Sequence, residues 1–281
     1  MLISMKPILR AATEKKYGVV APNIFDGYTI EAAFQCALEL RAPMVLDTNG
    51  DMAQLEYLAE VSRYYSNKYP QVPVALNLDH GDSLENVLQA LHVGFTSVML
   101  DRSSAPFEEN VRETAEVVRA AHAVGAAVEA ELGHVGFGRD YGVSDADTLT
   151  RPEDVAEFVK RTDVDCLAVA VGTAHGHYAG TPHIDFERLD AIRQITDIPL
   201  VLHGGSSTGD ENLRQAIQHG VSKVNIGTDL GDAGISAMKD YLGSYDPHRR
   251  GVIEYVYQAG AKGFGAKLKH YMELFGERNR W

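Results

Sequence analysis

Short apolar runs alternate with segments of helical periodicity along most of the chain. The runs have the nearly continuous apolar character of strands that are buried on both faces, as in a parallel sheet. They start near Gly18, Met44, Val74, Thr96, Ala127, Cys166, Leu200 and Lys223. Helical spacing appears between them, over residues 30–40, 55–65, 84–91, 111–124, 155–159, 189–195, 213–219 and about 229–241. This alternation predicts an α/β fold with a (β/α)8 TIM barrel, whereas a doubly wound open sheet usually uses fewer such units.

Two segments fall outside the alternation. Residues 132–150 form a long connection that carries Gly133, Gly136, Gly138 and Gly142, and loops of that length are usually functional or disordered. The tail beyond Pro247 predicts extra C-terminal helices that close the barrel or pack on a partner subunit. Because no Pro/Gly/Ser-rich linker divides the chain, we expect residues 1–281 to form a single domain.

The composition indicates a globular protein with a sizeable core, since 45% of the 281 residues are hydrophobic and 23% are charged. The net charge of −13 argues against binding to nucleic acid or to an anionic membrane surface. No apolar stretch approaches the roughly 20 residues of a membrane span, and the N-terminal residues lack the apolar core of a signal peptide. We interpret Cys36 and Cys166 as reduced and buried, which is typical of a cytoplasmic protein.

Three histidines each follow an apolar run: His80 the third, His175 the sixth and His203 the seventh. The carboxyl ends of parallel barrel strands gather at one mouth, where barrel enzymes place their active sites. Three protein ligands with one open position is the coordination of a catalytic zinc ion. The pattern therefore predicts a metal-assisted enzyme that holds one catalytic Zn²⁺ per subunit.

Carboxylates lie at the same strand ends. Asp79 precedes His80, Asp101 follows the fourth strand, and Glu129 and Glu131 lie on the fifth. Strand alternation sends the side chains of Asp79 and His80 in different directions unless the strand ends between them. We therefore expect Asp79 to act as a general acid/base rather than as a ligand.

Glycine-rich turns follow the seventh and eighth strands. One turn, residues 203–207, precedes a helix that is expected to start near Thr208 or Asp210, and residues 225–229 repeat that layout. Backbone N–H groups can approach an anion closely at such glycines, although ordinary β-to-α turns can also be rich in glycine. Phosphate sites after strands seven and eight recur in barrel enzymes. The predicted phosphate site consists of Gly204, Gly205, Ser206, Asn225, Gly227 and Thr228.

These motifs resemble those of the class II aldolases, the zinc-dependent fructose-bisphosphate and tagatose-bisphosphate aldolases. The resemblance spans about residues 17 to 241, with the motifs in the family's order and spacing. It rests on Leu78-Asp79-His80 with Ser83, and on residues 129–133, 171–176, 203–206 and 223–226 with Thr228.

The resemblance implies reversible aldol cleavage of a ketose phosphate or bisphosphate to dihydroxyacetone phosphate and an aldehyde. It implies Zn²⁺ on His80, His175 and His203, with Asp79 as the acid/base at the aldehyde oxygen. It places a second divalent or monovalent cation at Asp101 and Glu131. The substrate-binding residues that it implies are Asn23, Gly176, Gly204, Gly205, Ser206, Asn225, Ile226, Gly227 and Thr228. The partners that we expect are a sugar phosphate and further copies of the chain, in a homodimer or homotetramer.

The chemistry agrees with this resemblance. Breaking a C–C bond beside a ketone leaves an enediolate, whose charge a metal ion can stabilise by several kcal/mol. The alternative is a Schiff base on a desolvated lysine. No lysine ends a predicted strand, and Lys223 is expected to open the eighth strand at the opposite end of the barrel. The metal route is therefore favoured.

The chain also departs from the family pattern. The loop after strand five has Arg139 about where the family has a proton-moving glutamate, with Asp140 beside it. An arginine cannot act as a base, so it would pair with an anionic group on the aldehyde half of the substrate or lie free in solvent. Gly227 replaces a residue that is often acidic, alanine or asparagine, and residues 47–51 are unusually acidic for a second phosphate site. We infer that the metal and first phosphate sites are retained and that the aldehyde end is altered.

Two other functions stay open on the sequence alone. One is isomerisation or epimerisation of a sugar phosphate at the same metal site. The other is binding of a phosphosugar by a barrel that has lost its proton shuttle.

Overall fold

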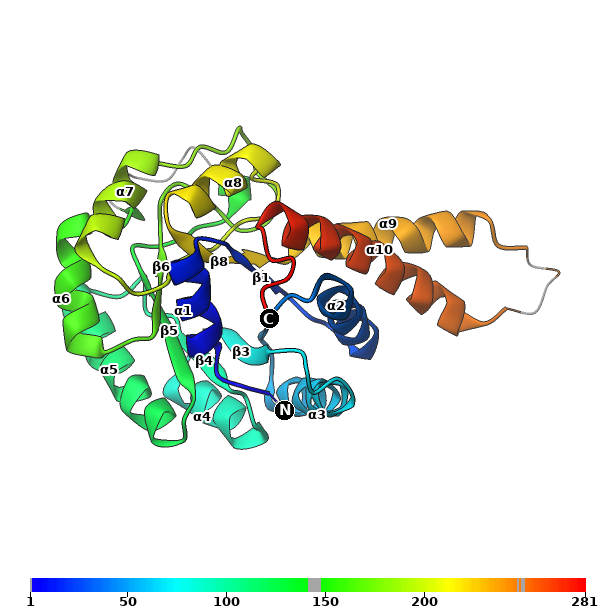
Figure 1. The fold of residues 1–281 in the computed structure, drawn as a ribbon, viewed down its shortest axis with the longest axis horizontal. Helices are drawn as coiled ribbons and strands as arrows, with labels where there is room; N and C mark the ends of the chain where they lie inside the picture. The colour runs from blue at the N-terminus through cyan, green and yellow to red at the C-terminus, as the bar shows by residue number, and fades with distance from the viewer. Residues whose placement is uncertain (1, 141–147, 247, 249–250) are drawn as a thin grey trace.

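The computed structural model describes residues 2–140, 148–246, 248 and 251–281. Within them, eight parallel strands form one sheet in the order β1-β8-β7-β6-β5-β4-β3-β2. The strands are β1 (Val19–Pro22), β2 (Met44–Thr48), β3 (Val74–Gly81), β4 (Ser97–Leu100), β5 (Ala127–Leu132), β6 (Cys166–Val169), β7 (Leu200–Leu202) and β8 (Val221–Ile226). The Ile24 N–H donates to Asp47 O at 2.9 Å, and Asn23 and Asp47 form a parallel bridge, so β1 meets β2 and the barrel closes. The TIM barrel that the sequence predicted is confirmed (Figure 1).

A helix follows each strand, and further helices lie outside the repeat. The repeat helices are α2 (Gly27–Leu40), α3 (Met52–Lys68), α4 (Leu84–Val93), α5 (Phe107–Ala123), α6 (Pro152–Thr162), α7 (Phe186–Ile195), α8 (Asp210–Gln218) and α9 (Thr228–Gly243). Outside the repeat lie α1 (Met5–Lys15), the short 3-10 helix η1 (Gly138–Asp140) and α10 (Ile253–Leu274). Gly142 and Pro247, which the sequence analysis singled out, lie outside the described residues.

Polar caps fix several of the turns that lead from a strand into a helix. Asp26 forms a capping box with Thr29 at the start of α2. Asp51, Ser83 and Asp185 each accept a hydrogen bond from the backbone N–H three residues further on, at the starts of α3, α4 and α7. Such caps satisfy N–H groups that the helix itself leaves without partners. They hold the loops at the carboxyl ends of the strands in defined positions.

Helix α1 closes the amino end of the barrel, which the sequence analysis did not predict. Met5, Ile8 and Leu9 pack against side chains at the starts of the strands inside the barrel, including Ala75 and Ala127. Small side chains at these interior positions leave the space that α1 fills. A single short amphipathic segment before the first strand has no place in the β/α repeat, which is why the pattern did not reveal it.

Helices α9 and α10 form a hairpin that extends well beyond the barrel (Figure 1). After α10 the chain returns to β1: Gly18 N–H donates to Phe275 O at 3.0 Å, and Val20 N–H donates to Glu277 Oε1 at 2.6 Å. The expected C-terminal helical extension is thus confirmed, and its end packs beside β1.

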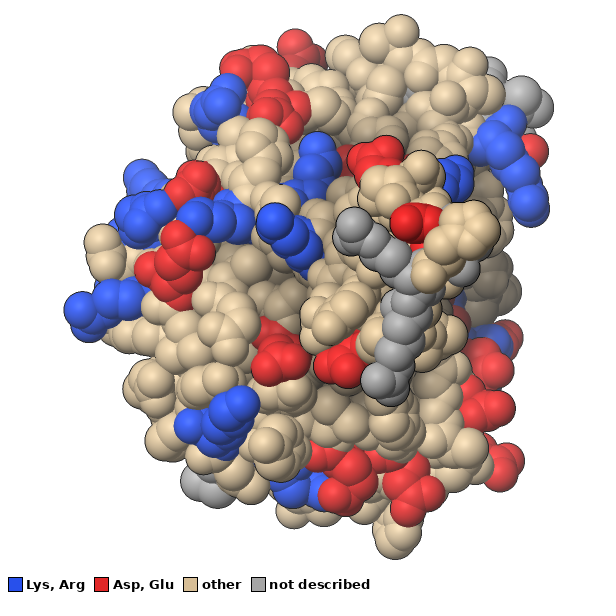
Figure 2. Space-filling view, turned by 90° about the vertical axis from the view of Figure 1, so that its right-hand side faces the viewer, with Lys and Arg blue, Asp and Glu red and all other residues tan. Residues whose placement is uncertain are grey.

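The structure bears on the membrane span, the surface charges and the two cysteines. No helix in the described part of the chain is long and apolar enough to span a bilayer. Figure 2 shows acidic and basic side chains interspersed on the face toward the hairpin. Cys36 and Cys166 are both free and buried, as expected.

Glu277 is a buried carboxyl at the junction of the tail with β1. Its Oε2 has no hydrogen-bond partner among the described residues. Burial raises the pKa of Glu277 well above its usual value, and the hydrogen bond from Val20 only partly opposes this effect. The folded protein therefore binds this proton more tightly than the unfolded chain does.

We predict that the free energy of unfolding falls as pH rises above 4.5, the ordinary pKa of glutamate. The slope from this one group is up to about 1.4 kcal/mol per pH unit until the folded-state pKa is passed. Glu277→Gln keeps the acceptor for Val20 and removes the titration, so its unfolding free energy should depend less on pH. Chemical denaturation between about pH 5 and pH 8 measures the difference. The exposed Glu273→Gln variant is the control and should keep the wild-type slope; equal slopes for wild type and Glu277→Gln would contradict the prediction.

Candidate active site

A cavity of about 650 Å³ opens at the carboxyl ends of the strands. Its lining includes residues from the ends of β1, β3, β4, β6, β7 and β8, together with the start of α9. The sequence-predicted residues that line it are Asn23, Asp79, His80, Asp101, His175, Gly176, Gly204, Ser206, Asn225, Gly227 and Thr228. The sequence therefore located the mouth of the barrel that carries the cavity.

The end of β3 brings both Asp79 and His80 into the site. Strand alternation alone would separate them, but the pairing of β3 with β4 shifts register between Leu78 and Gly81. His80 has a φ of +49°, a left-handed conformation that is uncommon for a residue with a side chain. Strain of this kind gathers at functional sites, where the surrounding structure maintains it. As a result, His80 Nε2 lies 3.9 Å from Asp79 Oδ1, with both groups in the cavity wall.

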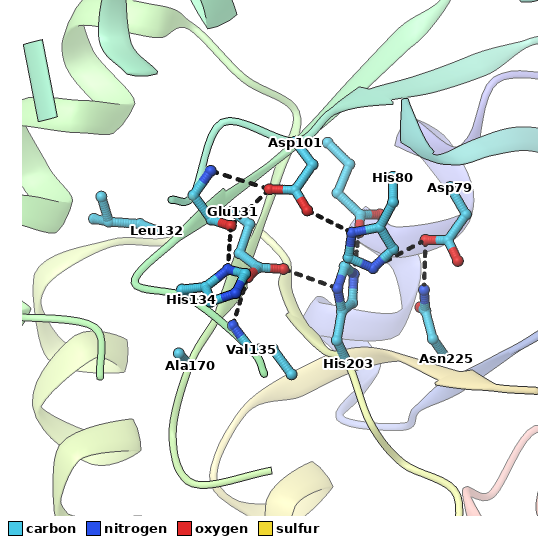
Figure 3. A network of polar contacts seen from close by, with 12 residues as sticks. Asp79, His80, Asp101, Glu131, Leu132, His134, Val135, Ala170, His203 and Asn225 are labelled. Atoms are coloured by element: carbon cyan, nitrogen blue, oxygen red, sulfur yellow. Dashed lines mark hydrogen bonds and ion pairs between the residues drawn. The ribbon is translucent and has the colours of Figure 1, made fainter. Parts of the chain in front are cut away.

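The three predicted histidines converge. The ring centroid of His80 lies 4.9 Å from that of His175 and 4.5 Å from that of His203, and the remaining pair is 5.8 Å apart. One nitrogen from each ring lies within 4.8 Å of the others, which is close enough for a shared metal ion. Figure 3 shows His80 and His203 facing each other beside Asp79.

The hydrogen bonds of these rings fit a metal site. A metal-bound histidine usually gives its second ring nitrogen to a carboxylate or carbonyl. Here His80 Nδ1 lies 2.7 Å from Asp101 Oδ2, and His203 Nε2 lies 2.8 Å from Glu129 Oε1. The other nitrogens are buried and face carboxylates: His80 Nε2 lies 3.9 Å from Asp79 Oδ1, and His203 Nδ1 lies 3.0 Å from Glu131 Oε2. Ring nitrogens beside carboxylates are groups that could bind a cation together with them.

The electrostatics of the rings support the same conclusion. Burial, together with the positive charges at His203 and His80, lowers the pKa of His175 to about 4. Burial also acts to lower the pKa of His203, but the carboxylates of Glu129 and Glu131 outweigh it and hold that pKa well above its usual value. The pocket around His203 therefore favours positive charge, and a metal cation would replace the proton because metal ligands must be deprotonated.

A second group of ligand atoms adjoins the first. His80, Asp101 and Glu131 also bring one ligand atom each within 4.8 Å of one another, where the sequence placed a second cation. Ser103 Oγ donates to Asp101 Oδ1 at 2.6 Å and lies 2.9 Å from His134 Nδ1. The sequence analysis did not identify Ser103, and this contact is what ties His134 to the site.

A buried polar layer lies inside the barrel around Lys223. This lysine is the third residue of β8, with its Nζ 2.9 Å from Asp47 Oδ2, 2.9 Å from Glu129 Oε2 and 2.8 Å from Asn225 Oδ1. The expectation that Lys223 opens strand eight was wrong, because β8 begins at Val221 and alternation turns Lys223 inward.

Lys223 nevertheless does not suit Schiff-base chemistry. Burial acts to lower its pKa, but the carboxylates of Asp47 and Glu129 outweigh it, so the pKa is raised and the ammonium stays charged. A protonated amine with its hydrogens engaged cannot attack a ketone. The metal route is therefore still favoured, for a different reason than strand position.

The acidic residues after strand two also serve other purposes than the sequence suggested. Asp47 points into the barrel interior, and its Oδ1 accepts from Asn77 Nδ2 at 3.0 Å. Asp51 caps α3. Of this segment only Asn49 lines the cavity. The acidity of residues 47–51 thus says little about the substrate.

The loop after β7 is shaped by two glycines. Gly204 has a φ of +67°, and a side chain there would meet Ala174 O at 2.4 Å. A Cβ on Gly205 would instead meet Val224 and Ile226, so Gly205 is required for packing against β8. Neither Gly205 nor Ile226 lines the cavity, in contrast to the other residues that were predicted to bind the substrate.

Asp229 ties this loop to the start of α9. Its carboxylate accepts from the backbone and the hydroxyl of Ser207, both at 3.0 Å, and from the hydroxyl of Tyr271. Ser206 Oγ accepts from the Asp229 N–H at 3.2 Å. Helix α9 has no side-chain cap from Gly227, and of its first N–H groups that of Asp229 is taken by Ser206. α8 begins at Asp210, as predicted.

Arg139 and Asp140 lie on the rim rather than in the cavity wall. The side chain of Arg139 is 78% exposed, with its Nε 3.5 Å from Asp140 Oδ2. Its guanidinium lies 5.0 Å above the ring of Phe137, which does line the cavity. Arg139 is therefore exposed to solvent, with Phe137 and Asp140 as its neighbours.

The sequence analysis missed the outer wall of the cavity. Phe25, Phe137, Asp232 and Ile235 line it from the loops after β1 and β5 and from α9. An exposed phenylalanine in a loop is the signal that could have indicated Phe25 and Phe137, which are 51% and 59% exposed.

Comparison with known proteins identifies the family. The family model for class II fructose-bisphosphate aldolases matches residues 3–280. The crystal structure of the YdjI aldolase from Escherichia coli K12 is 31% identical, with a TM-score of 0.86 over 99% of this chain and 98% of that one. A fructose-bisphosphate aldolase from Campylobacter jejuni shares the fold at 22% identity, with a TM-score of 0.83 over 100% and 97% of the two chains. The chain belongs to the class II fructose-bisphosphate aldolase family, and it is a lyase.

Proposed function

We propose that this enzyme cleaves a ketose phosphate reversibly to dihydroxyacetone phosphate and an aldehyde, with the help of a zinc ion. The observation that carries the proposal is the convergence of His80, His175 and the buried His203 beside Asp79, with Asp79, His80 and His175 lining one cavity. Family membership supports a metal-dependent aldolase that acts on a sugar phosphate.

The three histidines would hold the metal. Imidazole nitrogens favour zinc over magnesium, which prefers oxygen ligands and keeps several waters. When bound, the metal would act as a Lewis acid on the substrate's carbonyl and stabilise the charge that develops there. Asp101 and Glu129 would orient His80 and His203 through the second ring nitrogens, and Asp101 with Glu131 would hold the second cation.

Asp79 would move the proton of the substrate hydroxyl. Burial acts to raise its pKa, but the positive charges of His80, His203 and Lys223 outweigh it and hold the pKa below its usual value. The carboxylate is therefore ionised and able to accept a proton. In cleavage it takes the proton of the hydroxyl that becomes the aldehyde oxygen, the C–C bond breaks, and its electron pair stays on the ketone half as an enediolate. In condensation Asp79 returns that proton to the aldehyde oxygen.

The phosphate would lie between the loop after β7 and the start of α9. Gly176, Gly204, Ser206, Gly227 and Thr228 line the cavity there. The N–H groups at the start of a helix, together with its dipole, favour an anion. Asn225 would contact the same half of the substrate, while Gly205 and Ile226 would support the loop from below.

The aldehyde half would meet the outer wall. Asn23 would lie near this half of the substrate, because it lines the cavity and its Nδ2 donates to Asp79 Oδ2 at 3.3 Å. Arg139 on the rim would pair with an anionic aldehyde half. In condensation Asp140 or a water would take the proton from the carbon of dihydroxyacetone phosphate that becomes the enediolate carbon, and in cleavage the same group would supply a proton to that carbon.

Coupled detection of dihydroxyacetone phosphate from a panel of ketose phosphates tests the proposal. We expect release that stops when a chelator removes the metal and resumes when zinc is restored. Interconversion of ketose phosphates without release would indicate an isomerase or epimerase instead. Binding without any turnover of the panel would indicate a non-catalytic phosphosugar-binding protein.

The metal ligands are tested by His203→Ala. Loss of one of three ligands should strongly lower the zinc content of the purified protein. Metal analysis of wild type and variant measures it, with His92→Ala, on the outer helix α4, as the matched control. Equal zinc content in wild type and His203→Ala would exclude His203 from the site.

The proton-transfer role is tested by Asp79→Ala. The variant should keep its metal, while kcat falls by roughly 10²–10⁴, the usual contribution of a positioned acid or base. Steady-state kinetics at saturating zinc, with metal analysis in parallel, separate the two effects. Near-wild-type turnover would rule out the role, and loss of metal would make Asp79 part of the metal site instead.

A further inference from the structure

Lys223 is the one buried lysine of the described polar layer, and its ammonium group contacts three other side chains of that layer. An ammonium carries three hydrogens, with no acceptor of its own. Three oxygens lie within 3 Å of Nζ, on Asp47, Glu129 and Asn225. The hydrogen-bonding capacity of the group is therefore used in full.

Two of these partners extend to different parts of the proposed machinery. Glu129 contacts Lys223 through Oε2 and His203 through Oε1, the latter at 2.8 Å. Asn225 accepts from Lys223 through Oδ1 and donates through Nδ2 to Asp79 Oδ1 at 2.9 Å. The Lys223 ammonium is thus linked through one side chain to the proposed metal ligand His203 and through another to the proposed acid/base Asp79.

We propose that Lys223 is a positioning residue that orients His203 through Glu129 and Asp79 through Asn225. The inference rests on the proposed roles of His203 and Asp79, and it adds the group that fixes the orientation of both side chains.

Each of the two chains of contacts, through Glu129 and through Asn225, has a physical basis. With Oε2 held by Lys223, the Glu129 carboxylate keeps Oε1 on His203 Nε2 and so leaves Nδ1 on the side of Glu131 Oε2, 3.0 Å away, and of the other two histidines. A carboxylate in this position fixes the ring orientation and the tautomer of a metal-bound histidine. The amide of Asn225 could otherwise flip, but a cation can accept nothing, so Oδ1 must face Lys223 and Nδ2 must face Asp79.

A neutral side chain would lose this arrangement. Methionine has a similar length to lysine but donates no hydrogen bond, and it would leave Glu129 and Asn225 free to turn away. Buried carboxylates without their partner are also costly. The third partner, Asp47, contacts neither His203 nor Asp79 in the described structure, so Asp47→Asn offers a control in which the charges of the same layer change but neither positioning contact is lost.

The test compares Lys223→Met with Asp47→Asn, each purified, stripped of metal and checked for folding by circular dichroism. Zinc affinity is measured by competition with a chromophoric chelator, and the visible spectrum of the cobalt-loaded protein reports ligand geometry. We expect Lys223→Met to weaken zinc affinity about 10–100-fold, the usual effect of losing support behind a ligand, and to change the cobalt spectrum. At saturating zinc its kcat should still fall while KM changes little, because Asp79 is no longer held. Asp47→Asn should remain close to wild type in all three.

Two results would overturn the proposal. One is a folded Lys223→Met protein with wild-type zinc affinity, cobalt spectrum and kcat. The other is an equal loss in Asp47→Asn, which would show a general charge effect. If Lys223→Met does not fold, Lys223→Met/Asp47→Asn restores the charge balance and is judged by the same criteria. A wild type that binds zinc but releases no dihydroxyacetone phosphate would refute the proposed function, and the zinc affinity and cobalt spectrum would still decide whether Lys223 orients His203.

Discussion

The balance of charge inside the barrel is the constraint on which the site depends. Asp47, Asp79, Glu129 and Glu131 are all buried in the upper part of the interior, and Lys223 is the buried cation that faces them. Buried carboxylates are stable only when they are paired or protonated. Burial raises the pKa of Asp47 to about 7, although Lys223 opposes this, so Asp47 can relieve part of the imbalance by binding a proton. The remaining deficit of positive charge lies next to the histidines, which is where a metal cation would supply it.

The sequence predicted the parts of the structure that repeat. Alternating strands and helices gave the barrel, and the rule that barrel sites lie at the carboxyl ends of strands placed His80, His175 and His203 at one mouth. It did not reveal α1, because that helix stands outside the repeat. It also could not show that His80 shares a wall with Asp79, since this depends on the register shift in β3 and a left-handed φ.

The position of Lys223 could have been predicted, and the reason is instructive. Polar residues alternate with apolar ones in Asn77-Leu78-Asp79, Glu129-Ala130-Glu131 and Lys223-Val224-Asn225. Side chains two residues apart on a strand point to the same face. Because Asp79, Glu131 and Asn225 face the site, their partners two residues earlier must face the barrel interior as well. An error of two residues in the start of β8 concealed this pattern.

The two halves of the cavity are built from different kinds of structure. Apart from His175, which lies in the loop after β6, the groups proposed for metal binding and proton transfer stand on strands or directly at their ends, and the Lys223 layer joins β2, β5 and β8 beneath them. His203 and Asp79 cannot move independently of this layer, because Glu129 contacts His203 and Asn225 contacts Asp79. The outer wall consists of Phe25, Phe137, Asp232 and Ile235, which come from loops and from α9 and have no bond to that layer. Substitutions there change the surface that meets the aldehyde without disturbing the buried charges. A barrel of this design can therefore alter its choice of aldehyde while it keeps the same chemistry, and the departures of this chain at Arg139 and Asp140 lie on that adaptable side.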